Sequence, residues 1–387
     1  MLGAPRSSAD TLTNRGRLAQ LGEHLPYKQG VAGSSPAPPI VVKGVAVAAI
    51  VLAALVVAPG VGGSPRDDTN ALQRRLDSGG GTIFLRKLPN GACYRTRGLW
   101  VSHDDTRITP NGACIVAIGP GPVRLESTDG DPIPADAIFF VNHSNKLTPA
   151  PARIGISRLR LVVPAAARMY GIEIYGHVVT VRNVTITGSP IDDLYVGERA
   201  NGDGYASRIV ITHCRLESGG RNVLSAVSFI DLRIDHSTLV NASNAYHGTP
   251  KEGGNPSAGI DIEPNSRGNL ALDLRIAHNV IAHNGGPGIL LALTSPSGKP
   301  LNADRLTIVG NRIFDNGRSD RAVHGGIVFF GGQADGRGTA VVSDNRITGN
   351  RGAAISGWQM TTTVEARRND LRGNELGAYK DVKLKRR

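Results

Sequence analysis

The chain has 387 residues and a formal net charge of +12 at pH 7, with 49 glycines, 4% aromatic and 20% charged residues. This composition favours short strands joined by tight turns and argues against a helical bundle. A basic surface attracts anionic partners, acidic polysaccharides as readily as nucleic acids. Because the sequence has no motif that combines basic and aromatic residues for nucleic-acid binding, we expect no nucleic-acid partner.

The first forty residues resemble something other than a protein. Residues 16–39 read GRLAQLGEHLPYKQGVAGSSPAPP, which resembles a transfer-RNA gene translated in frame. With permissible codons, Ala19–Leu21 reproduces a D-arm, Pro26–Lys28 an anticodon loop and Gly33–Pro36 a T-arm, in the correct order. We therefore expect residues 1–40 to be unstructured and foreign to the native protein, and we exclude them from the fold.

Residues 41–63 have the pattern of a secretory signal. They contain one lysine, an apolar run from Val45 to Ala58, and small residues after it. This run is shorter than the ~20 residues that a membrane-spanning helix needs. We expect cleavage within residues 60–64, transient membrane contact, and a secreted or periplasmic protein. The alternative is an uncleaved segment that anchors the protein in the membrane.

Residues 64–150 are expected to form an N-terminal cap and the first coils of a repeat structure. Asp67–Asn70 precede Ala71–Leu76, which have the pattern of an N-capped amphipathic helix. Three glycines follow at positions 79–81, and Thr82–Leu85 are predicted to form the first strand. Such a helix can cover the open end of a solenoid.

The sequence contains three cysteines, and none is paired in a CxxC motif. Cys93 and Cys114 each end an Asn-Gly-Ala-Cys sequence, 21 residues apart. An oxidising compartment would permit a disulfide between them, and two separate buried thiols are the alternative. Cys214 is expected to be buried and unreactive.

Residues 151–377 contain an internal repeat. Four segments share the pattern Asn-x-Ile/Leu-x-x-Asn: IAHNVIAHN, IVGNRIFDN, VSDNRITGN and ARRNDLRGN, which end at Asn284, Asn316, Asn350 and Asn374. Earlier segments place other residues in the column of the first Asn, which runs through positions 159, 184, 214, 237, 279, 311, 345 and 369. The shortest intervals, 23 to 25 residues, suit one coil of three short parallel strands.

Asparagines that recur at one inward position can stack their amides from coil to coil and bond the backbone at a buried turn. We predict that these asparagines hold the fold and have no chemical role. The fold class is therefore all-β, a right-handed parallel β-helix with an N-terminal capping helix. The basic residues 378–387 are expected to form a solvated tail.

Several segments resemble proteins of the pectate-lyase-like superfamily. Residues 67–85 (DDTNALQRRLDSGGGTIFL), with Tyr94 and residues 99–117 (LWVSHDDTRITPNGACIVA), resemble the N-terminal signature of these parallel β-helix proteins. IDDLYVGERANGDG, RNVLSAVSFIDLRIDHSTL and SAGIDIEPN resemble a bacterial subset of the superfamily. The resemblance covers residues 65–377. It implies the fold and a polysaccharide as partner, but it leaves the reaction open, since the superfamily includes lyases, hydrolases, epimerases and surface proteins.

The strand after the second Asn column holds an acidic cluster. We align Asp193 with Asn222 in the next coil, and expect both to face solvent with Asp261 and Glu263. Arg221 flanks them, positioned to bind an acidic group. Residues two apart on a strand have Cα atoms about 6.5–7 Å apart, and Asp193 would lie about 9.6 Å away along the axis.

These carboxylates are the candidate catalytic groups. Inverting glycosidases hold two carboxyl groups ~6.5–9.5 Å apart, a range that Asp193, Asp261 and Glu263 could span, whereas retaining enzymes need ~5–5.5 Å. The structural alternative is that the carboxylates bind turn amides or arginines. Asn222 and Arg221 are predicted to contact substrate.

The 42-residue interval between positions 237 and 279 contains a long insertion beside Asp261. Long loops on a solenoid usually shape its binding groove. Within it, Tyr246 could stack on a sugar ring, and His247 or Lys251 could act as a base or bind a carboxylate. The alternative is that all three are ordinary loop residues. The histidines beside the Asn column are expected to be turn residues: His213, His236, His278 and His283.

The sequence thus predicts an exported protein that acts on a polysaccharide, as a glycoside hydrolase or a polysaccharide lyase. The rival interpretation is a β-helix that binds glycans or builds the cell surface without catalysis. No cofactor or metal site is expected, although nearby carboxylates offer weak support for calcium. The sequence specifies neither the sugar nor the oligomeric state.

Overall fold

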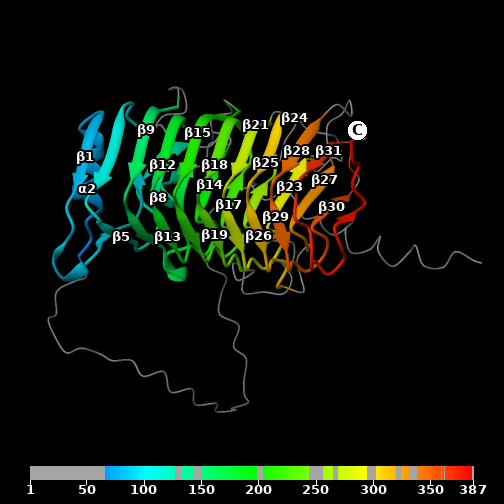
Figure 1. Cartoon of the computed structure of the whole chain (residues 1–387). Coiled ribbons are helices and arrows are strands. Elements are labelled where there is room, and N and C mark those ends of the chain that lie inside the picture. The colour runs from blue at the N-terminus through cyan, green and yellow to red at the C-terminus, as the bar shows by residue number, and fades with distance from the viewer. Residues whose placement is uncertain are drawn as a thin grey trace, which may run out of the picture.

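The computed structural model describes residues 66–126, 132–142, 150–197, 204–243, 256–264, 269–293, 302–319, 324–331, 338–358, 360 and 362–385. The elements stack along one axis into an elongated parallel β-helix, with the N-terminal helix at one end and the C-terminal strands at the other (Figure 1). The predicted signal segment 41–63 and the transfer-RNA-like residues 1–40 lie outside the described residues. The described residues include no helix with the length and apolarity that a membrane crossing requires.

Three parallel sheets run along the axis, and most coils contribute one strand to each. In the described part of the chain, the first sheet contains β1 (Gly81–Leu85), β4 (Thr106–Pro110), β9 (Ala152–Ser157), β12 (His177–Arg182), β15 (Ala206–Thr212), β18 (Phe229–Asp235), β21 (Leu270–Ala277), β24 (Asn302–Asp304), β25 (Leu306–Val309), β28 (Thr339–Ser343) and β31 (Thr363–Arg367). The second sheet contains β2 (Tyr94–Thr96), β5 (Cys114–Ala117), β10 (Arg160–Val162), β13 (Thr185–Thr187), β16 (Arg215–Glu217), β19 (Thr238–Val240), β22 (Val280–Ala282), β26 (Arg312–Phe314) and β29 (Arg346–Thr348).

The third sheet contains β3 (Leu99–Trp100), β8 (Ala137–Val141), β11 (Tyr170–Ile174), β14 (Leu194–Val196), β17 (Leu224–Ala226), β20 (Ile260–Ile262), β23 (Ile289–Leu293), β27 (Ile327–Gly331), β30 (Ile355–Trp358) and β32 (Tyr379–Lys380). Outside the three sheets, β6 (Val123–Glu126) and β7 (Pro132–Pro134) form an antiparallel pair, and η1 (Pro89–Gly91) and η2 (Ala165–Ala167) are short 3₁₀ turns. The solenoid continues into the segment expected to be a solvated tail, because β32 pairs with β30 and Leu384 bridges to Val364.

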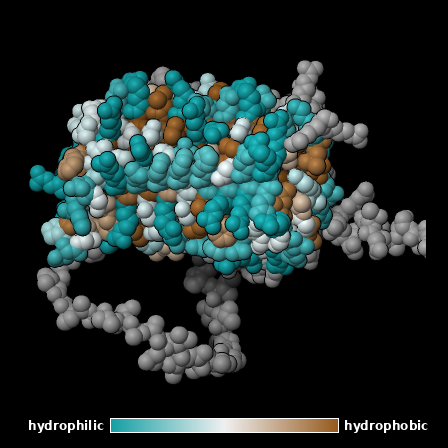
Figure 2. Space-filling view, viewed as in Figure 1, coloured by the Kyte–Doolittle hydropathy of each residue, from teal (hydrophilic) through white to brown (hydrophobic). Residues whose placement is uncertain are grey.

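Alternation along each strand sends one set of side chains into a continuous apolar core that extends from Leu72 to Val364. Ile281, Ile313 and Ile347 show the register: they pair directly in successive coils, and each is fully buried. The outward side chains on the face seen in Figure 1 are mostly hydrophilic, with scattered apolar patches (Figure 2). This arrangement confirms the repeat inferred from sequence.

The predicted asparagine ladder is present in two columns. In the first, the side-chain oxygen of each residue accepts the backbone N–H of its predecessor: Asn311 from Asn279 at 2.9 Å, Asn345 from Asn311 at 2.9 Å, and Asn369 from Asn345 at 2.9 Å. Ser237 takes the same role for Cys214 at 3.0 Å. The second column repeats the pattern from Ala242 through Asn284, Asn316, Asn350 and Asn374. The four histidines beside the ladder all adopt positive φ, as turn residues do: His213, His236, His278 and His283.

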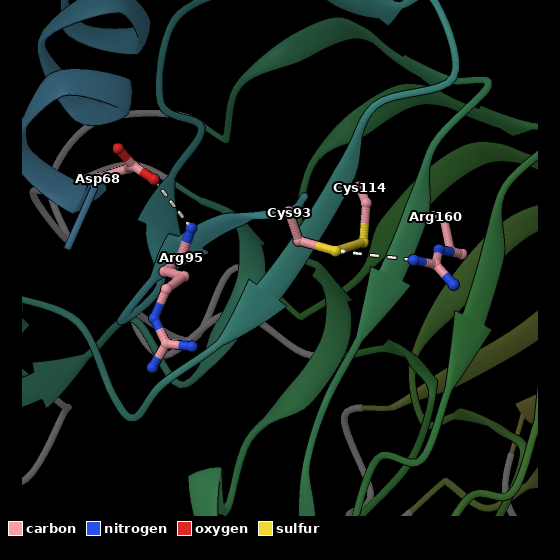
Figure 3. The surroundings of a disulfide bond; sticks show 5 residues. All are labelled: Asp68, Cys93, Arg95, Cys114 and Arg160. Carbon is pink, nitrogen blue, oxygen red and sulfur yellow. Dashed lines mark hydrogen bonds between the residues drawn. A yellow bond between two sulfur atoms is a disulfide. The ribbon is translucent and has the colours of Figure 1, made fainter. Parts of the chain in front are cut away.

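The N-terminal helix α2 (Thr69–Asp77) covers the first coil. Gln73 fixes it there, because its amide donates to Trp100 O at 3.1 Å and accepts from Trp100 N at 2.8 Å. The first coils are further held by a disulfide between Cys93 and Cys114 (Figure 3). The bridge resolves the alternatives that the sequence left open, whereas Cys214 is a free, buried thiol. Burial raises the pKa of that thiol to about 11, which keeps it protonated and unreactive.

Candidate functional site

The outer face of the third sheet carries the acidic strand β20. Ile260 and Ile262 point into the core, so Asp261 between them points outward. Asp261 pairs with Ser225 of β17 in the preceding coil and with Leu290 of β23 in the next. Contrary to expectation, this outward residue is only 1% exposed. The face is therefore a buried layer and not an open strand surface.

Aromatic rings line this face on the N-terminal side of Asp261. Trp100 and Phe140 have ring centroids 4.5 Å apart, Phe140 and Tyr175 are 5.3 Å apart, and Tyr195 lies 6.0 Å from Tyr175 and 5.7 Å from Tyr170. On the C-terminal side the face becomes apolar, with Ala258, Leu290, Ala292 and Val328 buried together. The polar groups around Asp261 are thus enclosed between an aromatic and an aliphatic cluster, where water screens charges poorly.

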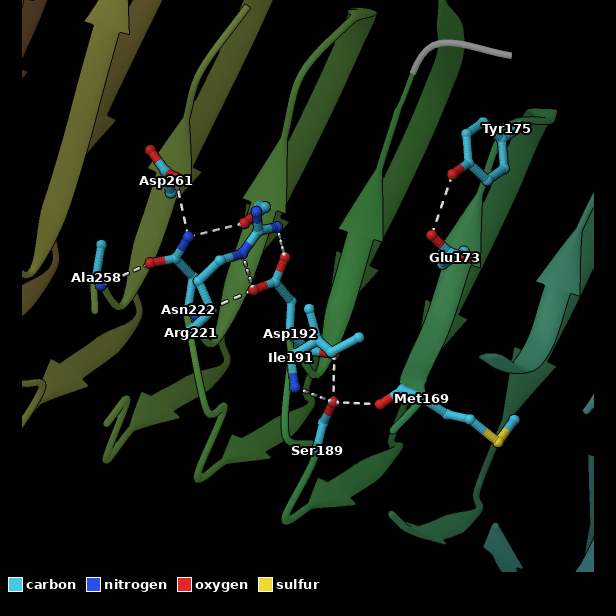
Figure 4. Close-up of polar contacts among 11 residues, drawn as sticks. Met169, Glu173, Tyr175, Ser189, Ile191, Asp192, Arg221, Asn222, Ala258 and Asp261 are labelled. Atoms are coloured by element: carbon cyan, nitrogen blue, oxygen red, sulfur yellow. Dashed lines mark hydrogen bonds and ion pairs between the residues drawn. The ribbon is translucent and has the colours of Figure 1, made fainter. Parts of the chain in front are cut away.

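An arginine from one coil and a carboxylate from the preceding coil form the base of the polar cluster (Figure 4). Arg221 donates to Asp192 through Nε at 2.9 Å and through a second guanidinium nitrogen. Burial alone would lower the pKa of Arg221, but the Asp192 carboxylate holds it above its ordinary value. The Arg221 side chain is 17% exposed and committed to Asp192, so it positions the cluster more than it presents a free charge.

Asn222 connects three coils. Its backbone N–H donates to Asp192 Oδ1 at 3.0 Å, and its side-chain oxygen accepts the Ala258 N–H at 2.8 Å. Its Nδ2 donates to Asp261 Oδ2 at 2.9 Å and to Ser225 Oγ at 3.0 Å (Figure 4). Asn222 therefore fixes one oxygen of Asp261, and the other has no hydrogen-bond partner among the described residues.

Asp261 and Glu263 both have raised carboxyl pKa values. Burial, and next the Glu263 charge, raise the pKa of Asp261 well above its ordinary range. Burial also raises the pKa of the partly buried Glu263, against the opposing effect of Arg221. Asp261 Oδ1 is buried and has no hydrogen-bond partner among the described residues. Burial without a donor favours the neutral form of a carboxyl, so Asp261 is the member of the pair that we expect to hold a proton.

The expected separation of ~6.5–9.5 Å between the catalytic carboxyls stays a prediction.

Asp193 is wrongly predicted to face solvent. Leu194 pairs with Leu224, which places Asp193 opposite Val223, a core residue, and not opposite Asn222. Asp193 is 0% exposed, and burial raises the pKa of its carboxyl well above the ordinary range. Glycines occupy the same position in the later coils, and a Cβ at Gly259 would meet the core residue Ile281. Asp193 is therefore a neutral interior group outside the site.

Asn222 was also expected to face solvent beside Asp193, but it lies one position earlier in the register, opposite Asp192, and is buried. Asp192 is the site residue that the sequence reasoning missed. Both acids precede β14 (Leu194–Val196), so alternation along the strand could not show that Asp192 is the one that faces the site.

The proposed loop residues Tyr246, His247 and Lys251 lie outside the described residues. Among the residues that are described, no group of three or more His, Cys, Asp or Glu side chains is arranged to hold a metal ion.

Comparison with known proteins gives similar structures and a matching family model. Three solved structures resemble the chain with TM-scores below 0.5: the tailspike gp49 of Acinetobacter baumannii bacteriophage Fri1, a capsular polysaccharide depolymerase (TM-score 0.48, 14% identity); the Streptococcus pneumoniae surface adhesin PfbA (0.48, 15%); and the A-module of the Azotobacter vinelandii mannuronan C-5 epimerase AlgE4 (0.40, 14%). The matches cover 83%, 84% and 82% of this chain, and 60%, 98% and 93% of those chains.

The chain thus spans less than two thirds of the tailspike's length. A search of curated proteins gives no match. The model of the right-handed β-helix region matches residues 164–371, more than half of the 387-residue chain. The chain therefore belongs to the family of right-handed β-helix proteins.

Proposed function

We propose that the protein acts on an acidic polysaccharide at the outer face of the third sheet, with Asp261 and Glu263 as its acid and base. The observation that supports this proposal is the placement of two carboxyls two residues apart in an enclosed layer, where Asp261 is 1% exposed and burial raises the pKa of both groups. Displaced pKa values from burial and like charge are typical of catalytic carboxyls, although structural networks can also produce them.

The position of both carboxyls on one side of the coil, two residues apart, favours elimination over hydrolysis. An inverting hydrolase needs its two carboxyls on opposite sides of the sugar, with room for a water. In β-elimination from a uronate, the base removes the C5 proton, the C4–O4 bond breaks, and the acid protonates O4. Two adjacent groups can do both on one side of the ring.

The protonation states match these roles. Asp261 carries the proton and can act as the acid, and Glu263 is the more accessible carboxylate and can act as the base. After elimination the proton lies on Glu263 and Asp261 is ionised. Proton transfer from Glu263 to Asp261 restores the starting state without a co-reactant. Arg221, held by Asp192, positions the cluster beside both carboxyls.

The test is to incubate the purified protein with a panel of polyuronates and neutral glycans. Elimination produces an unsaturated sugar that absorbs ultraviolet light together with a new reducing end, whereas hydrolysis produces the reducing end alone. Absorbing products from a polyuronate support the proposal. Reducing ends without absorbance would replace elimination with hydrolysis, and binding without cleavage would remove the catalytic role.

A non-catalytic, glycan-binding or surface protein is the second candidate. The observation that favours it is the burial of Asp261 and of the adjacent aromatic rings, which leaves little of this face open to a polymer. Under this interpretation Asp261, Asn222 and Arg221 tie three coils together. The same panel distinguishes the two, because a non-catalytic protein releases no products. Export through the segment 41–63 is part of both proposals.

A further inference from the structure

A polar pocket lies on the second sheet, away from the acidic pair. It has a volume of about 250 Å³ and is lined by Arg312 and Phe314 of β26, Arg346 and Thr348 of β29, and the turn residues Asp315 and Gly349. Pockets for drug-sized ligands measure ~300–1,000 Å³, so this one suits a smaller unit such as a single sugar residue.

Two guanidinium groups meet in this pocket without enough counter-charge. Arg312 and Arg346 are paired in register in adjacent coils, so both side chains leave the same outer face about 4.8 Å apart. Among the described residues Arg312 has no carboxylate within ion-pair distance, and its Cζ lies 5.7 Å from the Phe314 ring centroid. The ring orients this guanidinium without neutralising it.

The carboxylate nearest to Arg346 is already paired with another arginine. Arg346 Nε lies 3.8 Å from Asp370, whose two oxygens accept hydrogen bonds from Arg372 at 2.8 and 3.0 Å. The Arg372 guanidinium lowers the pKa of Asp370 to about 2. Arg346 thus makes only a long ion pair with this carboxylate, and its side chain is 64% exposed.

Elsewhere on the surface, several exposed arginines have a carboxylate of their own. Such pairs are Arg153–Asp105, Arg215–Glu217, Arg305–Asp273 and Arg368–Asp344. By contrast, Arg312 and Arg346 lie in register in adjacent coils and repel one another in the free protein. A bound carboxylate that takes hydrogen bonds from both would relieve that repulsion.

The other wall residues suit a sugar. Asp315, which lies 3.9 Å from His283 Nδ1, can accept hydrogen bonds from sugar hydroxyls, and Thr348 can donate and accept. Phe314 offers part of an apolar ring surface. With two arginines and one aspartate, the pocket retains a net positive charge.

We infer that this pocket binds one uronate residue of an acidic polysaccharide, with the sugar carboxylate between Arg312 and Arg346. The inference rests on the proposed polysaccharide partner but not on catalysis at Asp261. It gives the protein a second contact with the polymer, which would raise affinity by bivalent binding.

The experiment is calorimetric titration with trigalacturonate, and with its methyl ester as a probe of the same shape without the charges. We expect the protein to bind the acid more tightly than the ester. The double variant Arg312→Ala/Arg346→Ala should bind trigalacturonate at least tenfold more weakly, or with one site fewer. Phe314→Leu should weaken binding to a smaller extent.

Arg215→Ala is the matched control. Arg215 occupies the same column of the second sheet, linked through Thr238 and Val280 to Arg312, but Glu217 pairs with it. It should change the affinity by less than twofold. An equal loss in Arg215→Ala, or equal binding of acid and ester, would reduce the effect to general surface charge and overturn the inference. Unchanged binding in the double variant would overturn the binding role of the pocket and leave the proposed function standing. No binding of either probe by the native protein would count against both.

Discussion

Replacing Asn311 with alanine should destabilise the solenoid strongly, because this side chain bonds three coils. Its oxygen accepts the backbone N–H of Asn279 at 2.9 Å and the side-chain N–H of Asn279 at 3.0 Å. Its own Nδ2 donates to Ile276 O at 2.9 Å and to Asn345 Oδ1 at 3.0 Å. Alanine would leave the buried Asn279 N–H and Ile276 carbonyl without this partner. At about 1–3 kcal/mol for each orphaned buried group, we expect a loss of about 2–6 kcal/mol.

The assay is denaturant unfolding followed by circular dichroism, combined with hydrogen exchange, because solenoids can unfold coil by coil. Exchange should accelerate first at the Asn279 amide and in the two adjacent coils. Asn369→Ala is the control, since Asn369 ends the ladder, is only partly buried, and accepts from Asn345 alone. It should cost less than Asn311→Ala. A loss below about 1 kcal/mol for Asn311→Ala would refute the claim that the ladder stabilises the fold.

Three further predictions follow from the buried acids and the disulfide. Asp193→Val, which copies Val223 in the next coil, should maintain or raise the melting temperature at pH 7 and leave any glycan turnover intact; loss of turnover in a folded variant would return Asp193 to the site. Because the folded-state pKa of Asp261 is raised, its contribution to stability is complete below the unfolded pKa, near 3.8, and is lost as the pH rises through the folded value. Asp261→Asn should therefore flatten the decline in melting temperature as the pH rises above the unfolded pKa, and an unchanged decline would contradict the assignment. Removing the disulfide with Cys93→Ser/Cys114→Ser, which opens a connection of 21 residues, should cost about 3 kcal/mol in denaturant unfolding, and an unchanged midpoint would show that the bridge contributes nothing.

The fold could be predicted from sequence because its determinants are periodic. Asn279, Asn311 and Asn345 repeat with an isoleucine two residues later, and both positions face inward in every coil. Because the same buried turn must be hydrogen-bonded in each coil, the same residue types recur along the sequence. The disulfide remained an alternative, since spacing alone does not fix the distance between two cysteines.

The site was predicted only in part. Asp261 was correctly placed on a strand and points out of the coil, whereas Glu263 directly follows that strand. The register of the coil that holds Asn222 was wrong by one residue, because Val223 and Leu224 are both apolar and alternation permits two alignments. That error aligned Asn222 with Asp193 in place of Asp192. The burial of Asp261 could not be foreseen, because alternation along a strand shows which side a residue faces but not what covers that side.

The central claim is tested most directly by measuring stability and uronate elimination together on Asp261→Asn and Glu263→Gln. Asn and Gln retain the shape of each side chain, and Asn still accepts the hydrogen bond from Asn222. Our account predicts that both variants fold, with melting temperatures at pH 7 equal to or above that of the native protein, and that ultraviolet-absorbing products disappear. Variants that lose about 1–3 kcal/mol of stability but still eliminate at the native rate would contradict it, since the carboxyl pair would then serve the fold alone.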